Sequence, residues 1–261
     1  MSASTKLGRY WHCATTLGRT PRERAAIFWR LTKNLRVRFA LARHHPERTF
    51  VIDTRLGPVH LRDNFGDVTN LPGLLAQNIY RAGRLDGEGA ILDCGANVGL
   101  FSLWMRAHNP GRPIHCFEPL PGNARMIRLN CPDAVVNETA VGLGSATVDL
   151  GVDRQGLMAS SIAQAWPLEK AAFPVISLDR YAAEKGIGPV AFLKVDTEGM
   201  ELEVLDGARE LLRRTRRVAM ETHGEDRHRG SIERLVAAGL TIDGEERTGP
   251  AAGLLWASRP R

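Results

Sequence analysis

The sequence predicts an α/β fold built on a doubly wound, mostly parallel sheet. Short apolar runs alternate with helical segments from about residue 90 to the C-terminus, the order produced by parallel strands joined through crossover helices. The clearest unit has an apolar run at residues 90–92, glycines at 95 and 99, and an apolar helical segment that ends before Pro110 and Gly111. A strand, a tight glycine turn and a helix in this order are typical of nucleotide-binding sheets.

The first 84 residues predict an extension outside this sheet. Residues 1–19 are polar and are expected to be irregular. Thr20 and Glu23 form a capping-box pattern, and the helix that it begins has an apolar stripe at i, i+4 spacing, made of Ile27, Leu31, Leu35 and Phe39. A hairpin is expected over residues 49–62 and a further helix within 64–84. We therefore predict two parts, an extension over 1–84 and a core over 85–261.

The core elements follow from apolar runs and from the Gly and Pro residues between them. Helices are expected over residues 100–109, 121–130, 179–185, 200–217 and 231–238. Strands are expected over residues 90–92, 114–118, 134–137, 147–150, 175–178, 190–196, 218–221, 240–242 and 254–257. Residues 151–170 have no clear period and are expected to be a loop.

The net charge of +6 is unevenly distributed along the 261 residues. Residues 1–48 contain 11 Lys/Arg and 2 Asp/Glu, a net charge of +9, so the remainder, with 24 basic and 27 acidic residues, has −3. A slightly acidic body argues against an enzyme that acts on nucleic acid. The helix that begins at Thr20 is interpreted as packed on the body or on the partner subunit of a homo-oligomer. The alternatives are contact with a membrane surface through residues 20–45 and a collar for an anionic substrate.

Two kinds of segment that the sequence lacks indicate the cellular location of the protein. No apolar run approaches the ~18 residues of a transmembrane helix, and the N-terminus lacks the apolar core of a secretory signal. The four cysteines form no C-x-x-C pair, and we expect them to be free thiols in a reducing compartment. The expected location is therefore the cytoplasm.

The polar residues of the glycine turn indicate its ligand. Asp93, Gly95, Asn97 and Gly99 stand in the order D-x-G-x-N-x-G, which differs from the G-x-G-x-x-G of dinucleotide-binding turns. An acidic residue inside the turn suits a ligand that is cationic there rather than a pyrophosphate. Glu118 ends the next strand, at the position where nucleotide-binding folds have the carboxylate that accepts hydrogen bonds from ribose hydroxyls.

The turn looks like the first motif of class I S-adenosyl-L-methionine (SAM) methyltransferases. Together with residues 117–119 and 193–201, residues 92–99 resemble the FkbM family of these enzymes, a resemblance that covers about residues 60 to 225. It implies a seven-stranded Rossmann-like sheet and SAM as the cofactor, bound through Asp93, Gly95, Asn97, Gly99 and Glu118. It also implies O-methylation of a hydroxyl on a small molecule, such as a sugar, a glycolipid or a polyketide-type product. Asn137, at the end of the third strand, is a further candidate on the adenine side.

Four polar residues follow the fourth and fifth core strands. Asp196 and Glu198 come after the fourth strand, and Glu221 and His223 come at the end of the fifth. Because the ends of neighbouring strands lie side by side, we expect these four side chains to converge above the methyl group. Glu198 also has a structural alternative, which is to cap the N-terminus of the following helix.

The acceptor hydroxyl has to lose a proton, and the sequence leaves two routes open. In the first, His223 is the base and Glu221 or Glu198 orients it. In the second, a hard ion such as Mg²⁺, held by Asp196 and Glu221, lowers the pKa of the hydroxyl. The metal-free route is favoured because the sequence offers scattered single ligands rather than a compact metal motif.

A second class of function also stays open at this point, a SAM-binding or scaffold protein that transfers no methyl group. The basic segment over residues 1–48 is expected to be dispensable for SAM binding and to affect acceptor use or self-association, because it precedes the core and carries the excess charge.

Overall fold

A seven-stranded sheet forms the centre of the computed structural model, which describes residues 3–38, 43–144, 147–153, 158–161, 168–247 and 252–260. In pairing order its strands are β12 (Thr241–Arg247), β13 (Ala252–Ser258), β11 (Arg217–His223), β10 (Val190–Val195), β3 (Ala90–Cys94), β4 (Ile114–Phe117) and β5 (Val135–Asn137). The last five are parallel to one another, whereas β13 is antiparallel to both β11 and β12. The prediction of a doubly wound, mostly parallel, seven-stranded sheet is confirmed.

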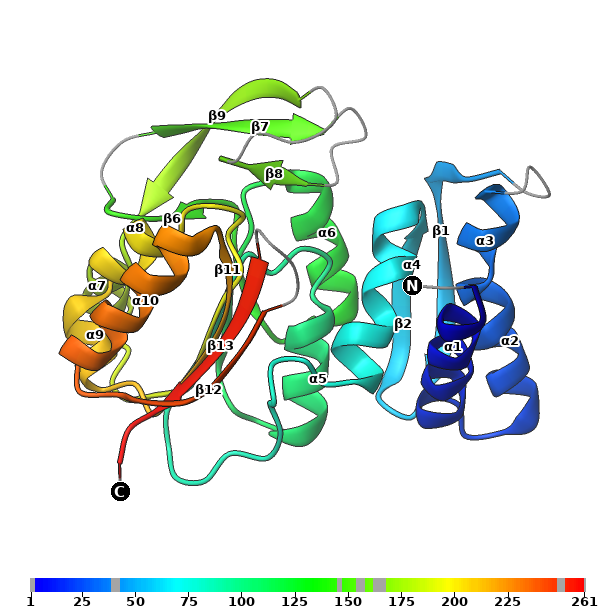
Figure 1. Cartoon of the computed structure of the whole chain (residues 1–261), viewed down its shortest axis with the longest axis horizontal. Coiled ribbons are helices and arrows are strands. Elements are labelled where there is room, and N and C mark those ends of the chain that lie inside the picture. The colour runs from blue at the N-terminus through cyan, green and yellow to red at the C-terminus, as the bar shows by residue number, and fades with distance from the viewer. Residues whose placement is uncertain are drawn as a thin grey trace.

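Helices cover both faces of this sheet (Figure 1). One face carries α5 (Leu100–His108) and α6 (Pro121–Asn130), and the other carries α7 (Leu178–Lys185), α8 (Glu201–Asp206), α9 (Arg209–Arg213) and α10 (Glu225–Ala237). Neighbouring residues of β3 alternate between the two cores, with Ile91 in the core of α5 and Leu92 in the core of α8. A strand buried on both faces is apolar at consecutive positions, and each such side chain contributes ~1.5–3 kcal/mol to stability.

The N-terminal elements lie outside α5 and α6, at the opposite end of the molecule from α7 to α10 (Figure 1). They are α1 (Ala3–Leu17), α2 (Pro21–Leu31), α3 (Lys33–Arg38), the hairpin of β1 (His45–Thr54) and β2 (Gly57–Asp63), α4 (Phe65–Leu71) and a π-helical turn, η1 (Pro72–Ala76). Ile27 and Leu31 of α2 share a core with Leu103 of α5 and Met126 of α6. The predicted capping box is confirmed, because the Thr20 hydroxyl accepts from the backbone N–H of Glu23 and the Glu23 carboxylate accepts from that of Thr20.

The prediction that residues 1–19 are irregular is wrong, since α1 covers most of them. Cys13, Ala14 and Leu17 are fully buried on one side of this helix and Tyr10 packs beside them. These residues have helical i, i+3, i+4, i+7 spacing, but they are too weakly apolar for the stripe to stand out. Tertiary packing therefore forms this helix where local propensity does not. Phe39, the last residue expected on the stripe of α2, lies outside the described residues.

A second, four-stranded sheet contradicts the predicted loop at residues 151–153, 159–160 and 168–170, whereas residues 154–157 and 162–167 of that range lie outside the described residues. It contains β6 (Ala140–Val141), β7 (Thr147–Asp153), β8 (Ala159–Ser160) and β9 (Leu168–Ile176). β7 pairs with β9 in an antiparallel register along its whole length, and this pairing holds a segment whose own sequence has weak strand character. β9 ends earlier than the strand expected at 175–178, because Ser177 caps α7 by accepting from the backbone N–H of Arg180.

All four cysteines lie in the described part of the chain, where they are buried free thiols, as expected. Burial raises the pKa of the Cys13 thiol to about 12 and that of Cys131 to about 11, so these two are poorly reactive at neutral pH. Among the described residues, no helix combines the length and the apolar character needed to cross a membrane.

Candidate active site

The glycine turn after β3 lies against the end of β10. Gly95 has a φ of 74°, in the left-handed region that favours glycine. A Cβ on this residue would lie 1.8 Å from the carbonyl oxygen of Asp196, so any larger residue would push the two strand ends apart. The turn is therefore in contact with the residues that follow β10, although they are far apart in sequence.

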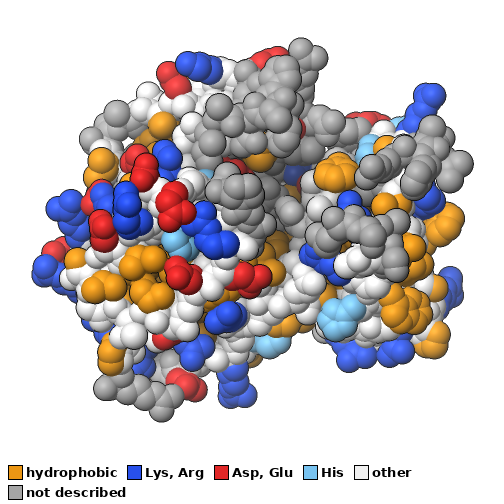
Figure 2. Space-filling model, in the orientation of Figure 1, with side chains coloured by type: hydrophobic (Ala, Val, Ile, Leu, Met, Phe, Trp, Pro, Cys, Tyr) orange, Lys and Arg blue, Asp and Glu red, His pale blue; other side chains and the backbone are white. Residues whose placement is uncertain are grey.

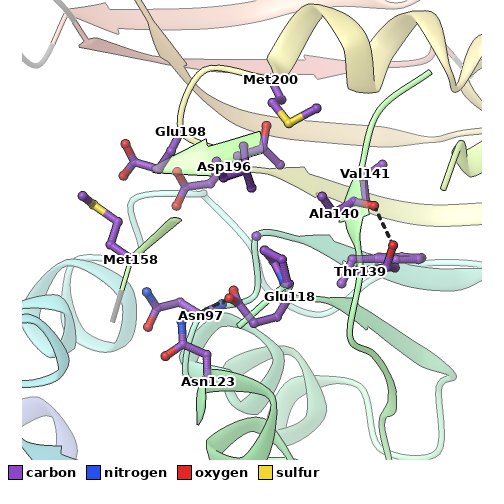
Figure 3. A pocket seen from close by; sticks show the side chains of 15 residues that line it. Asn97, Glu118, Asn123, Thr139, Ala140, Val141, Met158, Asp196, Glu198 and Met200 are labelled. Carbon is purple, nitrogen blue, oxygen red and sulfur yellow. Dashed lines mark hydrogen bonds between the residues drawn. The ribbon is translucent and has the colours of Figure 1, made fainter. Parts of the chain in front are cut away.

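A cavity of about 80 Å³, here called the inner cavity, opens between this turn and the ends of β4 and β10. In Figure 3, Asp196 and Glu198 lie across the cavity from Asn97, Glu118 and Asn123. The remaining wall is largely apolar and comes from the segments around β6 to β8 and α8, with Thr139, Ala140, Val141, Leu150, Met158 and Met200.

Glu118 is the buried acid of the inner cavity, with 5% of its surface exposed. One carboxylate oxygen accepts from the backbone N–H of Asn97 at 2.9 Å, and the other accepts from Leu120 N–H and Asn123 Nδ2, both at 3.1 Å. Burial raises the pKa of Glu118 to about 7, even though these hydrogen bonds lower it. These three hydrogen bonds hold the side chain in place at the wall of the inner cavity, and its binding to ribose hydroxyls stays a prediction.

Asp93 lies beneath the inner cavity rather than in its lining. Its side chain is fully buried, accepts from Ser102 Oγ at 2.7 Å and lies 3.2 Å from Lys194 Nζ. Lys194 in turn donates to the carbonyl oxygen of Gly95 at 2.6 Å and lies 3.6 Å from Asp196 Oδ2. Asp93 therefore supports the glycine turn through Lys194, a residue that sequence reasoning did not select.

Two other residues predicted to bind the cofactor do not line the inner cavity and contact other parts of the protein instead. Gly99 begins α5, and a Cβ there would lie 3.2 Å from Ile127 Cα, so it permits close packing on α6. Asn137 Nδ2 donates to the carbonyl oxygen of Cys116 and to Tyr181 Oη. Thr139 and the two residues of β6 line the inner cavity in its place.

The four residues expected to converge do so at the ends of β10 and β11. His223 Nε2 lies 3.6 Å from Glu198 Oε2 and 4.0 Å from Glu221 Oε1. Asp196 completes the group, since ligand atoms of Asp196, Glu198 and His223 all lie within 4.8 Å of one another. Tyr80 Oη donates to Asp196 Oδ2 at 2.9 Å and so holds this carboxylate in place. We call the side chains of Asp196, Glu198, Glu221 and His223 the acidic cluster.

Glu201 orients the histidine of the acidic cluster. Its carboxylate is fully buried, accepts from the backbone N–H of Gly199 and lies 2.8 Å from His223 Nδ1. With Nδ1 engaged, His223 directs Nε2 toward Glu198 and Glu221. Sequence reasoning missed Glu201, because an acidic residue in the first turn of a helix is explained by the helix dipole alone.

Glu198 does not cap α8. The N-cap of α8 is Met200, which makes no side-chain capping bond, so the structural alternative for Glu198 does not apply. Its backbone has a φ of 50°, a left-handed conformation that costs a non-glycine residue ~1–2 kcal/mol. Ser160 Oγ and the backbone N–H of Ser161 both donate to the Glu198 carbonyl and stabilise this conformation.

Charges within the acidic cluster shift each other's pKa. Burial and then repulsion from Asp196 raise the pKa of Glu198 and of Glu221 to about 7. Burial lowers the pKa of His223, but the hydrogen bond that its Nδ1 donates to Glu201 and the charges of the surrounding carboxylates outweigh burial and raise that pKa to about 9. At neutral pH the histidine therefore carries its proton, whereas the two glutamates are partly ionised.

A larger cavity of about 800 Å³, here called the outer cavity, adjoins the inner one and shares Gly95, Asn97, Met158, Asp196 and Glu198 with it. Its far wall comes from the N-terminal elements, with Arg9 of α1, residues 65–74 of α4 and η1, and Ile79 and Tyr80 beyond them. Phe65, Leu74 and Ile79 make part of this wall apolar, while Thr69 and Asn70 add polar groups. Two residues of the acidic cluster, Asp196 and Glu198, thus lie where the two cavities meet, whereas Glu221 lines the outer cavity alone and His223 lines neither.

The acidic cluster also includes a set of side chains able to hold a metal ion. Of the described residues, Asp196, Glu198 and His223 form such a group, with oxygen and imidazole ligands that suit Mg²⁺ or Mn²⁺. The sequence-based candidates for metal ligands were Asp196 and Glu221, so the geometry favours a partly different set.

Residues 93–237 match the family model described as the methyltransferase FkbM domain. The chain belongs to the FkbM methyltransferase family. It is accordingly a SAM-dependent methyltransferase, and the resemblance of its three motifs to this family is confirmed. An FkbM relative, the 31-O-demethyl-FK506 methyltransferase FkbM of Streptomyces tacrolimicus, is 27% identical over 195 residues, a match that covers 60% of this chain and 74% of that protein.

Solved methyltransferase structures are similar to this FkbM chain at lower identity. Precorrin-6y C5,15-methyltransferase from Geobacter metallireducens is 12% identical, with a TM-score of 0.43, over 70% of this chain and 85% of that one. The ribosomal protein L11 methylase from Lactobacillus delbrueckii subsp. bulgaricus is 13% identical, with a TM-score of 0.46, over 76% of this chain and 81% of that one.

Proposed function

We propose that this FkbM methyltransferase transfers the methyl group of SAM to a hydroxyl group of a small molecule. The observation that carries this proposal is the acidic cluster, of which Asp196 and Glu198 line both cavities. Transfer to an alcohol needs a group that takes a proton beside the reacting oxygen, and the cluster offers several. In this arrangement SAM occupies the inner cavity and the acceptor occupies the outer one.

The lining of the inner cavity suits SAM in charge and in hydrogen bonding. When bound, SAM supplies an electrophilic methyl group on a cationic sulfonium. The rigid Glu118 carboxylate matches a ribose diol, and Asp196 and Glu198 put negative charge at the opposite wall. Gly95 lets the turn approach the carbonyl oxygen of Asp196, with which a Cβ would collide. We therefore assign cofactor contact to Gly95, Asn97 and Glu118, and supporting roles to Asp93 and Gly99.

The outer cavity supports a hydroxylated acceptor with an apolar part. Its volume of about 800 Å³ lies in the range of cavities that enclose drug-sized ligands. Its wall combines aromatic and aliphatic side chains with polar ones, which suits a glycoside, a glycolipid or a polyketide-type alcohol. The name of the Streptomyces tacrolimicus relative, an O-demethyl-FK506 methyltransferase, is consistent with this class.

Glu198 is the base that the electrostatics favour. The sequence alone favoured His223, but a pKa of about 9 leaves this residue protonated at neutral pH. Glu198 lines both cavities and has a pKa of about 7, which is well matched to proton transfer at neutral pH. We assign to Glu198 the role of the base. Its carboxylate takes the proton of the acceptor hydroxyl while the hydroxyl oxygen bonds to the methyl carbon and the bond between that carbon and the sulfur of SAM breaks. His223 then positions Glu198 and Glu221 through its charge.

The metal-dependent route is the second candidate, and the proximity of Asp196, Glu198 and His223 favours it. These three residues would hold a divalent ion, which would supply a Lewis acid that lowers the pKa of the hydroxyl. His223 would then be neutral, because a metal competes with its proton.

An acceptor screen with methyl-labelled SAM tests the proposed function. Sugars, glycolipids and polyketide-type alcohols are offered in turn, and a labelled methyl ether is the expected product. Glu118→Ala should raise the Kd for SAM about tenfold or more, because a charged hydrogen bond contributes ~1.5–3 kcal/mol. Glu138→Ala is the control, since Glu138 pairs with Arg128 on the surface.

Three results would contradict this proposal. Label on a nitrogen atom would rule out O-methylation. Unchanged SAM affinity in Glu118→Ala would refute the placement of the cofactor. SAM binding without transfer to any acceptor would favour the non-catalytic alternative.

Phe65→Ala tests the assignment of the outer cavity. Phe65 is 62% exposed and lies at the start of α4 in the wall of this cavity, so an acceptor would cover its ring. Losing ~1–2 kcal/mol of apolar burial should raise KM for the acceptor roughly fivefold to thirtyfold, while the Kd for SAM stays the same. Leu129→Ala, an exposed position on α6 outside the lining of both cavities, should change neither value. Equal acceptor kinetics in the two variants would place the acceptor elsewhere.

A further inference from the structure

Two exposed tryptophans stand out on the N-terminal helices. Trp11 of α1 is 55% exposed and Trp29 of α2 is 60% exposed, although large aromatic side chains of water-soluble surfaces are usually covered. Trp11 stacks edge-on against Phe28, with ring centroids 5.7 Å apart, and Phe28 directly precedes Trp29. Leu7, also exposed, lies one helical turn before Trp11. Phe28 itself is partly buried against the core that contains Ile27 and Leu31, so we call only the exposed side chains of Leu7, Trp11 and Trp29 the tryptophan face.

The tryptophan face is not the side on which α2 packs onto the body. Ile27 and Leu31 are fully buried and join the core shared with α5 and α6. Trp29 is two residues from each of them, which puts it on the opposite side of the helix. The interpretation of α2 as a helix packed on the body is therefore correct only for the side that carries Ile27 and Leu31. Packing on the body does not explain why the side that carries Trp29 is also apolar.

Basic side chains surround the tryptophan face. The Arg36 guanidinium lies 3.7 Å from the centre of the Trp29 ring, and Arg36 also donates to the Trp29 carbonyl. Arg22 and Arg30 are exposed on α2, with Arg22 two helical turns before Trp29. Figure 2 shows orange and blue side chains next to one another at this end of the molecule. The net charge of residues 1–48 is +9, whereas that of the remainder is −3.

We propose that the tryptophan face binds the surface of an anionic phospholipid membrane. Indole rings prefer the boundary between headgroups and acyl chains, and basic residues beside them are attracted by anionic headgroups. Both features occur together in helices that lie on a membrane without crossing it. In this arrangement α1 and α2 contact the lipid, and the body remains in water.

Charge decides between the membrane and two other occupants. A second copy of the chain, meeting this one face to face about a two-fold axis, would bring two segments of +9 together. A nucleic acid would neutralise the charge of the arginines but would not bury the apolar side chains of Leu7 and Trp11. An anionic lipid surface satisfies the charge and the apolar side chains at once.

Co-flotation of the full-length protein with lipid vesicles tests this proposal. We expect binding to vesicles of phosphatidylcholine mixed with phosphatidylserine, and binding at least tenfold weaker to phosphatidylcholine alone. Trp11→Ala/Trp29→Ala should lose most of the binding, and Arg22→Gln/Arg30→Gln should weaken it and reduce its dependence on salt. Leu143→Ala/Val236→Ala, which removes exposed apolar side chains elsewhere, should bind like the wild type. Circular dichroism and thermal unfolding establish that each variant is folded.

Several results would overturn the proposal. One is equal vesicle binding by the wild type and a folded tryptophan double variant. Another is binding that does not depend on phosphatidylserine. A dimer that light scattering detects in the wild type and not in the tryptophan variant, without vesicle binding, would assign this face to a second copy. Binding to duplex DNA, lost in the arginine variant, together with no flotation, would assign it to nucleic acid.

Discussion

Glu198→Gln should lower kcat by about 100-fold or more, the usual size of a contribution from general base catalysis, while SAM still binds. Glutamine has nearly the same volume as glutamate but cannot take the proton of the acceptor hydroxyl. Glu198 lies at the junction of the two cavities, 3.6 Å from His223 Nε2. Glu184→Gln, which removes a surface partner of Arg180, is the matched control and should keep full activity.

The pH profile separates this role from a structural one. Since the pKa of Glu198 is raised to about 7, its carboxylate gains a proton as the pH falls below that value and then cannot act as a base. The rate constant kcat of the wild type should therefore rise with pH and level off above about 7, and Glu198→Gln should lose this rising limb. Wild-type kinetics in Glu198→Gln would rule out both the base and the cluster as the site of chemistry.

Exhaustive chelation of the same proteins distinguishes the two proton routes. In the metal-free route, turnover survives EDTA. Activity that EDTA abolishes and Mg²⁺ restores would instead assign the cation to Asp196, Glu198 and His223. In that case His223→Ala should weaken the binding of Mg²⁺ or Mn²⁺ in calorimetry, whether or not an acceptor is present.

Gly95→Ala should abolish detectable SAM binding and lower the free energy of unfolding by several kcal/mol. Its Cβ would lie 1.8 Å from the carbonyl oxygen of Asp196, so β3 and β10 would have to separate at the end that carries the site. Packed interiors accommodate such a shift poorly, and overpacking alone typically costs about 1–3 kcal/mol. The left-handed backbone adds ~1–2 kcal/mol for alanine.

Gly111→Ala is the matched control for this substitution. Gly111 has a φ of 78°, close to the 74° of Gly95, but a Cβ there would meet nothing within 4 Å. Gly111→Ala should therefore lower the free energy of unfolding only by the cost of the left-handed backbone, and its affinity for SAM should be unchanged. Urea unfolding and calorimetric titration of SAM measure both variants. Equal stability and equal SAM affinity in the two would contradict the steric argument and the position of the site beside Gly95.

The sequence by itself determined the central sheet and predicted which residues lie at its ligand edge. Strands buried on both faces are apolar at consecutive positions, and the turn after β3 needs glycine, so both leave a local signal around residues 90–99. Polar residues directly after such strands mark the ligand edge of a parallel sheet. For this reason the sequence predicted Glu118, Asp196 and Glu198 as site residues, and the structure places all three in the lining of the inner cavity.

Only the tertiary structure decided which side chains complete the site and what their charges are. Lys194 and Glu201 act through contacts with Asp93 and His223, and such contacts depend on which strands and helices are neighbours. The pKa that changes the preferred base from His223 to Glu198 likewise arises from burial and from carboxylates on several elements. The helix α1 and the strands around residues 151–170 form because distant segments pair with them, an effect that no local pattern contains.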